Sequence, residues 1–194
     1  MPSPIAHAAL GYAVYRVFKP YLLGENEPSI LKDRQLLTLA FGLSLLPDLD
    51  FLPGLLTDNA GEFHNGATHS PLMAVLVAVA AAVLARRRSD RWRTYFVFVL
   101  AAYGLHVLAD FVTMGRGTMV LWPVSDERIS PPLHIFYGLR RSEGIVSSLH
   151  FITLVNELLF VAALLGVLRV ATHIQQFRLR SSDKLSTELP DNQG

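Results

Sequence analysis

Seven side chains of kinds that commonly bind divalent metal ions lie at or near the ends of apolar segments. They are His7, Asp48, Asp50, His64, His69, His106 and Asp110. Imidazole and carboxylate ligands without thiolates suit Zn²⁺, Mn²⁺ or Fe²⁺, and the chain contains no cysteine. Ionisable groups inside apolar segments are costly and usually have a partner or a function. The residue types therefore predict a metal site and metal-assisted chemistry.

The histidines have spacings that suit a shared ion. His106 and Asp110 are four residues apart, so a helix places both side chains on one face. For this pair alone, a hydrogen bond between helices is the better interpretation. His64 and His69 flank a turn that contains a glycine, beside the two acids and the His/Asp pair. His7, at the start of the first apolar segment, gains weight only from the other six.

Two carboxylates close an apolar segment at Asp48 and Asp50, directly after Pro47. They could converge on one cation or bridge two; the alternative is a helix that proline ends, with solvated acids. Catalytic zinc typically takes three protein ligands and one water. Seven candidates exceed that number, so the sequence favours two ions, which could activate water and stabilise the leaving oxygen of a phosphoester. Glu157 and Asp50 are the candidate catalytic groups, and Glu157 could instead be a ligand or a second-shell partner of a histidine.

The elements that must position these groups are apolar. Hydrophobic residues make up 51% of the 194 residues and charged residues 17%, which is unusually apolar for a soluble domain. Five apolar segments are expected, at residues 4–18, 36–46, 69–85, 94–112 and 148–170. Ser70 and Pro71 read as the cap and first residue of the third helix. We expect one membrane-embedded domain over residues 1–171 and a disordered polar tail over 172–194.

The lengths of the segments predict an all-α integral membrane bundle of about five spans. A spanning helix needs about 20 apolar residues. The third to fifth segments meet this length, the second meets it if the acids lie at its end, and the first is marginal. The alternative is a soluble helical protein.

Loop charges predict the orientation. The hairpin at residues 86–93 holds five arginines and one aspartate, and short basic loops stay in the cytoplasm. The N-terminus is then outside and the C-terminus cytoplasmic, in a bacterial inner (plasma) membrane. All seven candidate ligands and Glu157 then lie near the outer face, which places the predicted metal site at one membrane face.

The ordered set of motifs resembles a known family. The motifs are early His7, Pro47-Asp48-Leu49-Asp50, His64 followed by Thr68-His69-Ser70-Pro71, His106 with Asp110, and Leu121-Trp122-Pro123. Together they resemble the YdjM-type bacterial inner-membrane metal-dependent hydrolases. The resemblance implies a hydrolase whose matched polar positions are the seven residues above. The ligand types are similar, more distantly, to those of zinc-dependent phospholipase C and S1/P1-type nucleases.

The main hypothesis is a membrane-bound metal-dependent hydrolase of phosphoesters, with a phospholipid at the outer interface as one candidate substrate. The alternative is a non-enzymatic membrane protein with a structural or sensing metal site or a partner-binding role. A transporter is less favoured, because the inner halves of the third and fifth segments carry no polar path. The expected partners are the lipid bilayer and the substrate. The formal net charge of +1 argues against direct nucleic-acid binding.

Overall fold

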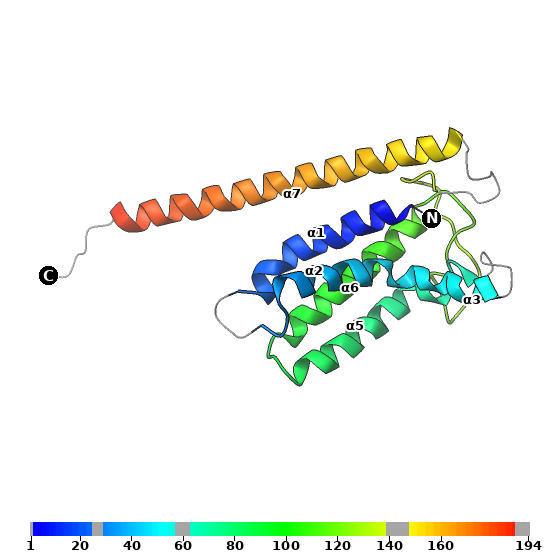
Figure 1. Cartoon of the computed structure of the whole chain (residues 1–194), viewed down its shortest axis with the longest axis horizontal. Coiled ribbons are helices and arrows are strands. Elements are labelled where there is room, and N and C mark those ends of the chain that lie inside the picture. The colour runs from blue at the N-terminus through cyan, green and yellow to red at the C-terminus, as the bar shows by residue number, and fades with distance from the viewer. Residues whose placement is uncertain (1, 25–28, 57–62, 139–147, 189–194) are drawn as a thin grey trace.

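The computed structural model describes residues 2–24, 29–56, 63–138 and 148–188, and in these residues the fold is all-α. The five long helices are α1 (Pro4–Leu22), α2 (Asp33–Leu45), α5 (Pro71–Arg86), α6 (Trp92–Phe111) and α7 (Ser148–Glu188). Three short helical elements are η1 (Leu46–Asp50), α3 (Phe51–Leu56) and η2 (Ala67–His69). The long helices run roughly along one direction (Figure 1). The described residues form isolated bridges but no strand, so the expected all-helical class is confirmed.

Three stretches are long and apolar enough to cross a membrane. They are Asp33–Gly54, which joins α2, η1 and the start of α3, then Trp92–Phe111 and His150–Phe177. The apolar helix α5 is shorter, at 16 residues. These features agree with the predicted helical membrane protein. Passage of α1 and α5 through the bilayer, which the count of five spans requires, stays a prediction.

Helix α6 is the centre of the bundle and contacts α1, α2 and α5. Its partner α5 buries Ala74, Ala78 and Ala82, which recur every fourth residue along one helix face. Small side chains at this spacing let two helix backbones approach closely. Phe98 of α6 is fully buried in the main apolar cluster. This packing fixes the axial position of α6, and with it the height of His106 and Asp110.

The acids of the second segment lie where α2 tightens into a different helix. Pro47 occupies the first turn of η1, which has 3₁₀ geometry through Asp50. A 3₁₀ helix has three residues per turn, so Asp48 and Asp50 point in directions about 120° apart. The predicted break at Pro47 is confirmed, and it aims the two carboxylates at different partners.

Two predicted helix ends differ from the structure. Helix α1 continues past Pro20 to Leu22, because the complete burial of Leu22 offsets the backbone hydrogen bond that proline removes. Helix α7 continues through the residues expected to form a disordered tail and ends at Glu188. Good helix formers such as Arg, Lys, Gln and Leu fill this stretch, and the next proline is Pro190.

Candidate metal centre

Four side chains from three elements meet at the end of the bundle that carries the N-terminus. Asp48 comes from η1, His69 from η2, and His106 and Asp110 from successive turns of α6. All four residues are buried, and one ligand atom of each lies within 4.8 Å of the others. His69 Nε2 lies 2.8 Å from Asp110 Oδ2 and 3.7 Å from Asp48 Oδ1. These four residues are called the four-ligand group below.

The spacing of these atoms fits one small cation. His106 Nε2 lies 3.1 Å from His69 Nε2, 3.5 Å from Asp48 Oδ1 and 3.6 Å from Asp110 Oδ2. Ligands about 2.0–2.1 Å from a tetrahedral ion are roughly 3.3 Å from one another. The printed separations, from 2.8 to 3.7 Å, lie on both sides of this value. Two nitrogen and two carboxylate ligands therefore have a spacing that zinc or a similar divalent ion could occupy.

Hydrogen bonds at the far side of each imidazole aim its other nitrogen inward. His106 Nδ1 lies 2.7 Å from the carbonyl oxygen of Ser44, and His69 Nδ1 lies 3.0 Å from Asp50 Oδ2. A carbonyl or carboxylate oxygen only accepts, so both Nδ1 atoms carry the proton. The two neutral rings then direct their Nε2 lone pairs at each other across 3.1 Å. Such an arrangement calls for a cation between them: a metal ion, or a proton held with the nearby carboxylates.

Buried polar atoms without hydrogen-bond partners gather at the same place. Among the described residues they include Asp48 Oδ1, both carboxylate oxygens of Asp110, and His64 Nε2. Buried polar groups are normally satisfied, and an unsatisfied one often marks a missing ion or water. The donor set therefore fits a divalent cation by chemistry as well as by spacing.

Asp50 supports the site from outside the four-ligand group. It accepts from His64 Nδ1 at 2.7 Å and from the Thr68 hydroxyl at 2.7 Å, besides the His69 contact described above. A carboxylate that holds the far nitrogen of a metal-binding histidine fixes the tautomer and raises its basicity. Asp50, His64 and His69 also form a second possible metal group. Because His69 Nδ1 faces Asp50 here, the geometry favours a supporting role for Asp50.

His7 adds a fifth element to the centre. Its ring stacks on His106 with ring centroids 3.8 Å apart, and its Nε2 lies 3.4 Å from Asp110 Oδ1. The backbone of α1 approaches α2 closely, because a Cβ on Gly11 would lie 2.5 Å from Ser44 Oγ. Ser44 is also the residue whose carbonyl oxygen orients His106. The contact between α1 and α2 therefore sets the positions of two of the histidines.

Glu157 lies elsewhere, so its predicted place among the catalytic groups is corrected. It is fully buried on α7, where Oε1 accepts from the Ser3 backbone N–H at 2.6 Å and Oε2 from the Ser3 hydroxyl. Ser3 is the N-cap of α1. Glu157 belongs to neither possible metal group. It ties α7 to the start of the helix that carries His7, which makes it a positioning residue.

Two arginines in the loop after α6 reach the outer edge of the centre. Arg116 and Arg128 both donate to the carbonyl oxygen of His64, Arg128 at 3.0 Å. Arg128 also donates to the Asn65 carbonyl oxygen at 2.9 Å. Partial burial, and then the charge of Arg116, lower the pKa of Arg128 below its usual value. Sequence reasoning counted both arginines only as loop charges, because nothing in their spacing links them to a histidine about 50 residues earlier.

The turn between the histidines has a special backbone. Asn65 has φ of 59°, a left-handed conformation that asparagine adopts more readily than most residues. Tyr103 of α6 donates to the Thr68 carbonyl oxygen at 2.7 Å and fixes the far side of the turn. Ser70 caps α5 by accepting from the Met73 N–H, as the sequence predicted. These contacts hold His64 and His69 on opposite sides of Asp50.

All seven predicted ligands thus gather at one end of the bundle, whereas Glu157 does not join them. The chain matches the family of the YdjM inner membrane protein over residues 1–176, so it belongs to that family. It is 30% identical to the inner membrane protein YbcI of Escherichia coli strain K12 over 140 residues, covering 70% of this chain and 75% of that relative. No solved structure matches.

Proposed function

We propose that this chain, as a member of the YdjM inner membrane protein family, is a metal-dependent hydrolase of phosphoesters. One observation carries the proposal: the Nε2 atoms of His69 and His106 face each other at 3.1 Å, with both Nδ1 atoms already engaged. The buried carboxylates of Asp48 and Asp110 lie beside them. An inward-facing set of two nitrogens and two carboxylates supports a bound cation, and cations of this kind commonly serve hydrolysis.

The four-ligand group would hold the first ion. A bound divalent ion lowers the pKa of its water and polarises a phosphoryl oxygen. Asp48 and Asp110 supply the negative charge that offsets the ion, while Asp50 and the Ser44 carbonyl oxygen keep the two histidine rings in place. A second ion, which the sequence favours, would need His64 and Asp50 as ligands, together with a different hydrogen-bond arrangement around His69.

His64 is the proton acceptor that the geometry supports. Its Nδ1–H donates to Asp50, so a neutral ring keeps a lone pair on Nε2. That Nε2 atom is buried, has no hydrogen-bond partner and lies 3.9 Å from Asp48 Oδ1. An imidazole oriented by a carboxylate beside a metal site is suited to accept a proton from water. Asp50, the predicted catalytic acid, would then act through His64.

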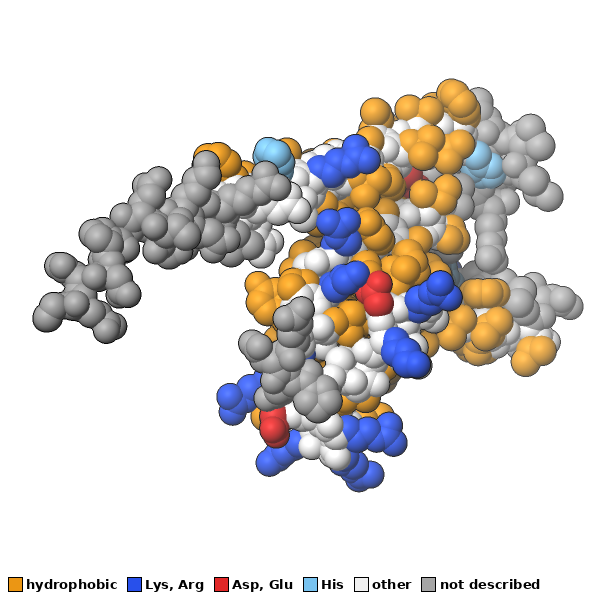
Figure 2. Space-filling model, turned by 60° about the vertical axis from the view of Figure 1, so that its left-hand side comes forward, with side chains coloured by type: hydrophobic (Ala, Val, Ile, Leu, Met, Phe, Trp, Pro, Cys, Tyr) orange, Lys and Arg blue, Asp and Glu red, His pale blue; other side chains and the backbone are white. Residues whose placement is uncertain are grey.

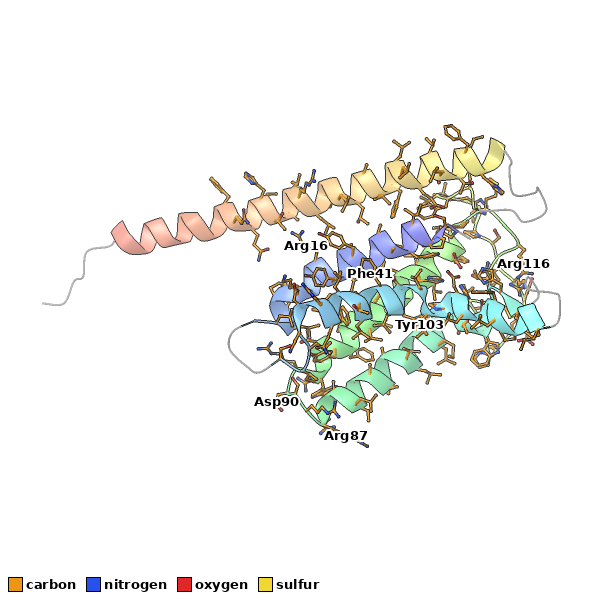
Figure 3. The ribbon with its side chains drawn as sticks, in the orientation of Figure 1. Arg16, Phe41, Arg87, Asp90, Tyr103 and Arg116 are labelled. Atoms are coloured by element: carbon orange, nitrogen blue, oxygen red, sulfur yellow. The ribbon has the colours of Figure 1, made fainter. Side chains whose placement is uncertain are left out.

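Positive charge at the outer edge supports an anionic substrate. Arg116 and Arg128 converge on the His64 carbonyl oxygen, and Figure 3 shows Arg116 at the end of the bundle opposite Arg87. Guanidinium groups are the preferred protein partners of phosphate oxygens. An apolar groove of about 510 Å³ runs between α5 and α6, from Pro71 to Leu100. It starts beside the residues that carry His69 and supports a phospholipid as the substrate.

The charge of the two ends supports the predicted orientation. Basic side chains concentrate at the end formed by the hairpin between α5 and α6 and by the start of α2, which Figure 2 turns toward the viewer. Basic segments remain on the cytoplasmic side. The metal centre, at the opposite end, would then lie at the outer face of the inner membrane.

The test is to purify the full chain in mild detergent and measure its metal content and its hydrolysis of bis(p-nitrophenyl) phosphate and phosphatidylglycerol. The wild type should hold at least one equivalent of a divalent metal and release product. His106→Ala should lose both. His134→Ala is the matched control, because His134 is a loop histidine that contacts Ser130 and should keep both.

Two results would overturn the proposal. Stoichiometric metal without turnover of either phosphoester would favour a structural or sensing site. Turnover that survives in His106→Ala, in a variant with unchanged helical circular dichroism, would place the chemistry elsewhere.

A further inference from the structure

A second cavity, of about 480 Å³, lies away from the metal centre, between α1, α2 and α7. Its walls are mostly apolar: Ala8 and Ala9 of α1, Phe41 of α2, and Val161 and Leu165 of α7. Arg16 and Arg169 line the same cavity. Figure 3 shows Arg16 and Phe41 on the side of the bundle that α7 faces. Among the described lining residues there are two cations and no carboxylate.

The position of Arg169 along α7 is unusual. It lies inside the apolar stretch His150–Phe177, which is long enough to cross a membrane. At 1.5 Å per residue, it is roughly 28 Å along the helix from His150, close to the thickness of the hydrocarbon core. Arg169 therefore lies at the far interface, where lipid phosphates are found. An arginine in such a segment usually has a partner.

Arg16 is held ready on the opposite wall. Its Nη1 donates to the Tyr12 hydroxyl at 3.0 Å, and its guanidinium lies 5.9 Å from the centre of the Tyr12 ring. Tyr12 also lines the cavity. One N–H of five is used in this bond, so the group can still present several donors to an anion. The side chain itself is solvent- or lipid-exposed.

We infer that this cavity binds one anionic phospholipid, with its phosphate between Arg16 and Arg169 and an acyl chain along Phe41 and Leu165. The charge of the cavity selects an anion, and the apolar wall selects a lipid over a soluble phosphate. Basic pockets between membrane helices commonly hold anionic headgroups. The lipid would bridge α7 to the bundle, since among the long helices α7 packs mainly on α1. This inference does not depend on the proposed hydrolase activity.

The experiment titrates a fluorescent phosphatidylglycerol into the full chain in mild detergent, with phosphatidylcholine as the neutral comparison. Each basic residue contributes about fivefold to binding of an anionic lipid, so Arg16→Gln with Arg169→Gln should weaken it about 30-fold. The matched control is Arg87→Gln with Arg88→Gln, in the basic hairpin outside the cavity. It should change affinity less than twofold, and metal content should be unchanged in all proteins.

Several outcomes overturn the inference: equal binding of phosphatidylcholine, equal loss in the hairpin control, or full competition by millimolar inorganic phosphate. If the double glutamine variant does not fold, a photoactivatable phosphatidylglycerol is crosslinked to the wild type. Crosslinks at Tyr12 or Leu165 support the site, and crosslinks confined to other surfaces exclude it.

Discussion

Replacing Asp50 with asparagine separates a supporting carboxylate from a metal ligand. Asp50 accepts from two imidazole N–H groups, those of His64 and His69, and from the Thr68 hydroxyl. Asparagine has one oxygen that can accept, and its NH₂ group can only donate. At least one imidazole N–H in Asp50→Asn must then face another donor, so that ring loses its fixed orientation.

The expected magnitude follows from this loss. Removing the outer partner of a metal-binding histidine typically lowers metal affinity 10- to 100-fold, or about 1.4–2.7 kcal/mol. Asp110→Asn, in contrast, removes an anionic member of the four-ligand group and should abolish stoichiometric binding. Asp33→Asn is the matched control. Asp33 lies at the other end of α2, where it is paired with Lys19 at 2.9 Å, and its loss should leave metal affinity unchanged.

The assay is a Zn²⁺ titration of metal-free protein in detergent, in competition with a chelator of known affinity. Circular dichroism confirms that each variant is folded. If folded Asp50→Asn loses metal as completely as Asp110→Asn, Asp50 is a ligand and the arrangement with a second ion is correct. If its affinity equals that of the wild type, the orienting role assigned to Asp50 is wrong.

Three further predictions concern packing, protons and the apolar groove. Gly11→Ala should destabilise the protein by about 1–3 kcal/mol, because its Cβ would meet Ser44, whereas Gly42→Ala has open space around it and should stabilise by about 0.5–1 kcal/mol; thermal unfolding in detergent measures both. Zn²⁺ affinity should fall as pH drops below about 6.5, by about tenfold per unit for each imidazole protonated in the metal-free protein, in titrations between pH 5 and 8. Gly104→Leu fills space beside the groove between α5 and α6, so hydrolysis of phosphatidylglycerol should fall while that of bis(p-nitrophenyl) phosphate is kept, and equal loss of both would contradict the lipid role.

Local rules predicted the parts of the site that local geometry determines. His106 and Asp110 share one face of α6 because their spacing matches the helical period. Ser70 before Pro71 marked the start of α5, and Pro47 marked the end of α2. Each of these features depends on residues within one or two turns of each other.

Features that depend on packing between distant elements were not predictable. The identity of the partner of Glu157 depends on how far α7 has shifted along α1, and a long irregular stretch precedes α7. The different directions of Asp48 and Asp50 depend on η1 being a 3₁₀ helix, because their separation would be about 200° in an α-helix and about 240° in a 3₁₀ helix. Arg116 and Arg128 reach His64 only because the loop after α6 folds back over the turn.

The charges around the centre favour an anionic substrate over a neutral one. In the four-ligand group, Asp48 and Asp110 offset a divalent ion, so this inner set is neutral once the histidines are unprotonated. Asp50, the third carboxylate, faces two guanidinium groups at the outer edge, those of Arg116 and Arg128, and the charges of Asp50 and Arg128 interact. Two positive groups therefore stand against one negative group, and an anion entering from the loop side would restore the balance. A neutral ester would gain nothing from that excess, so competition by inorganic phosphate should be stronger in the wild type than in Arg116→Gln.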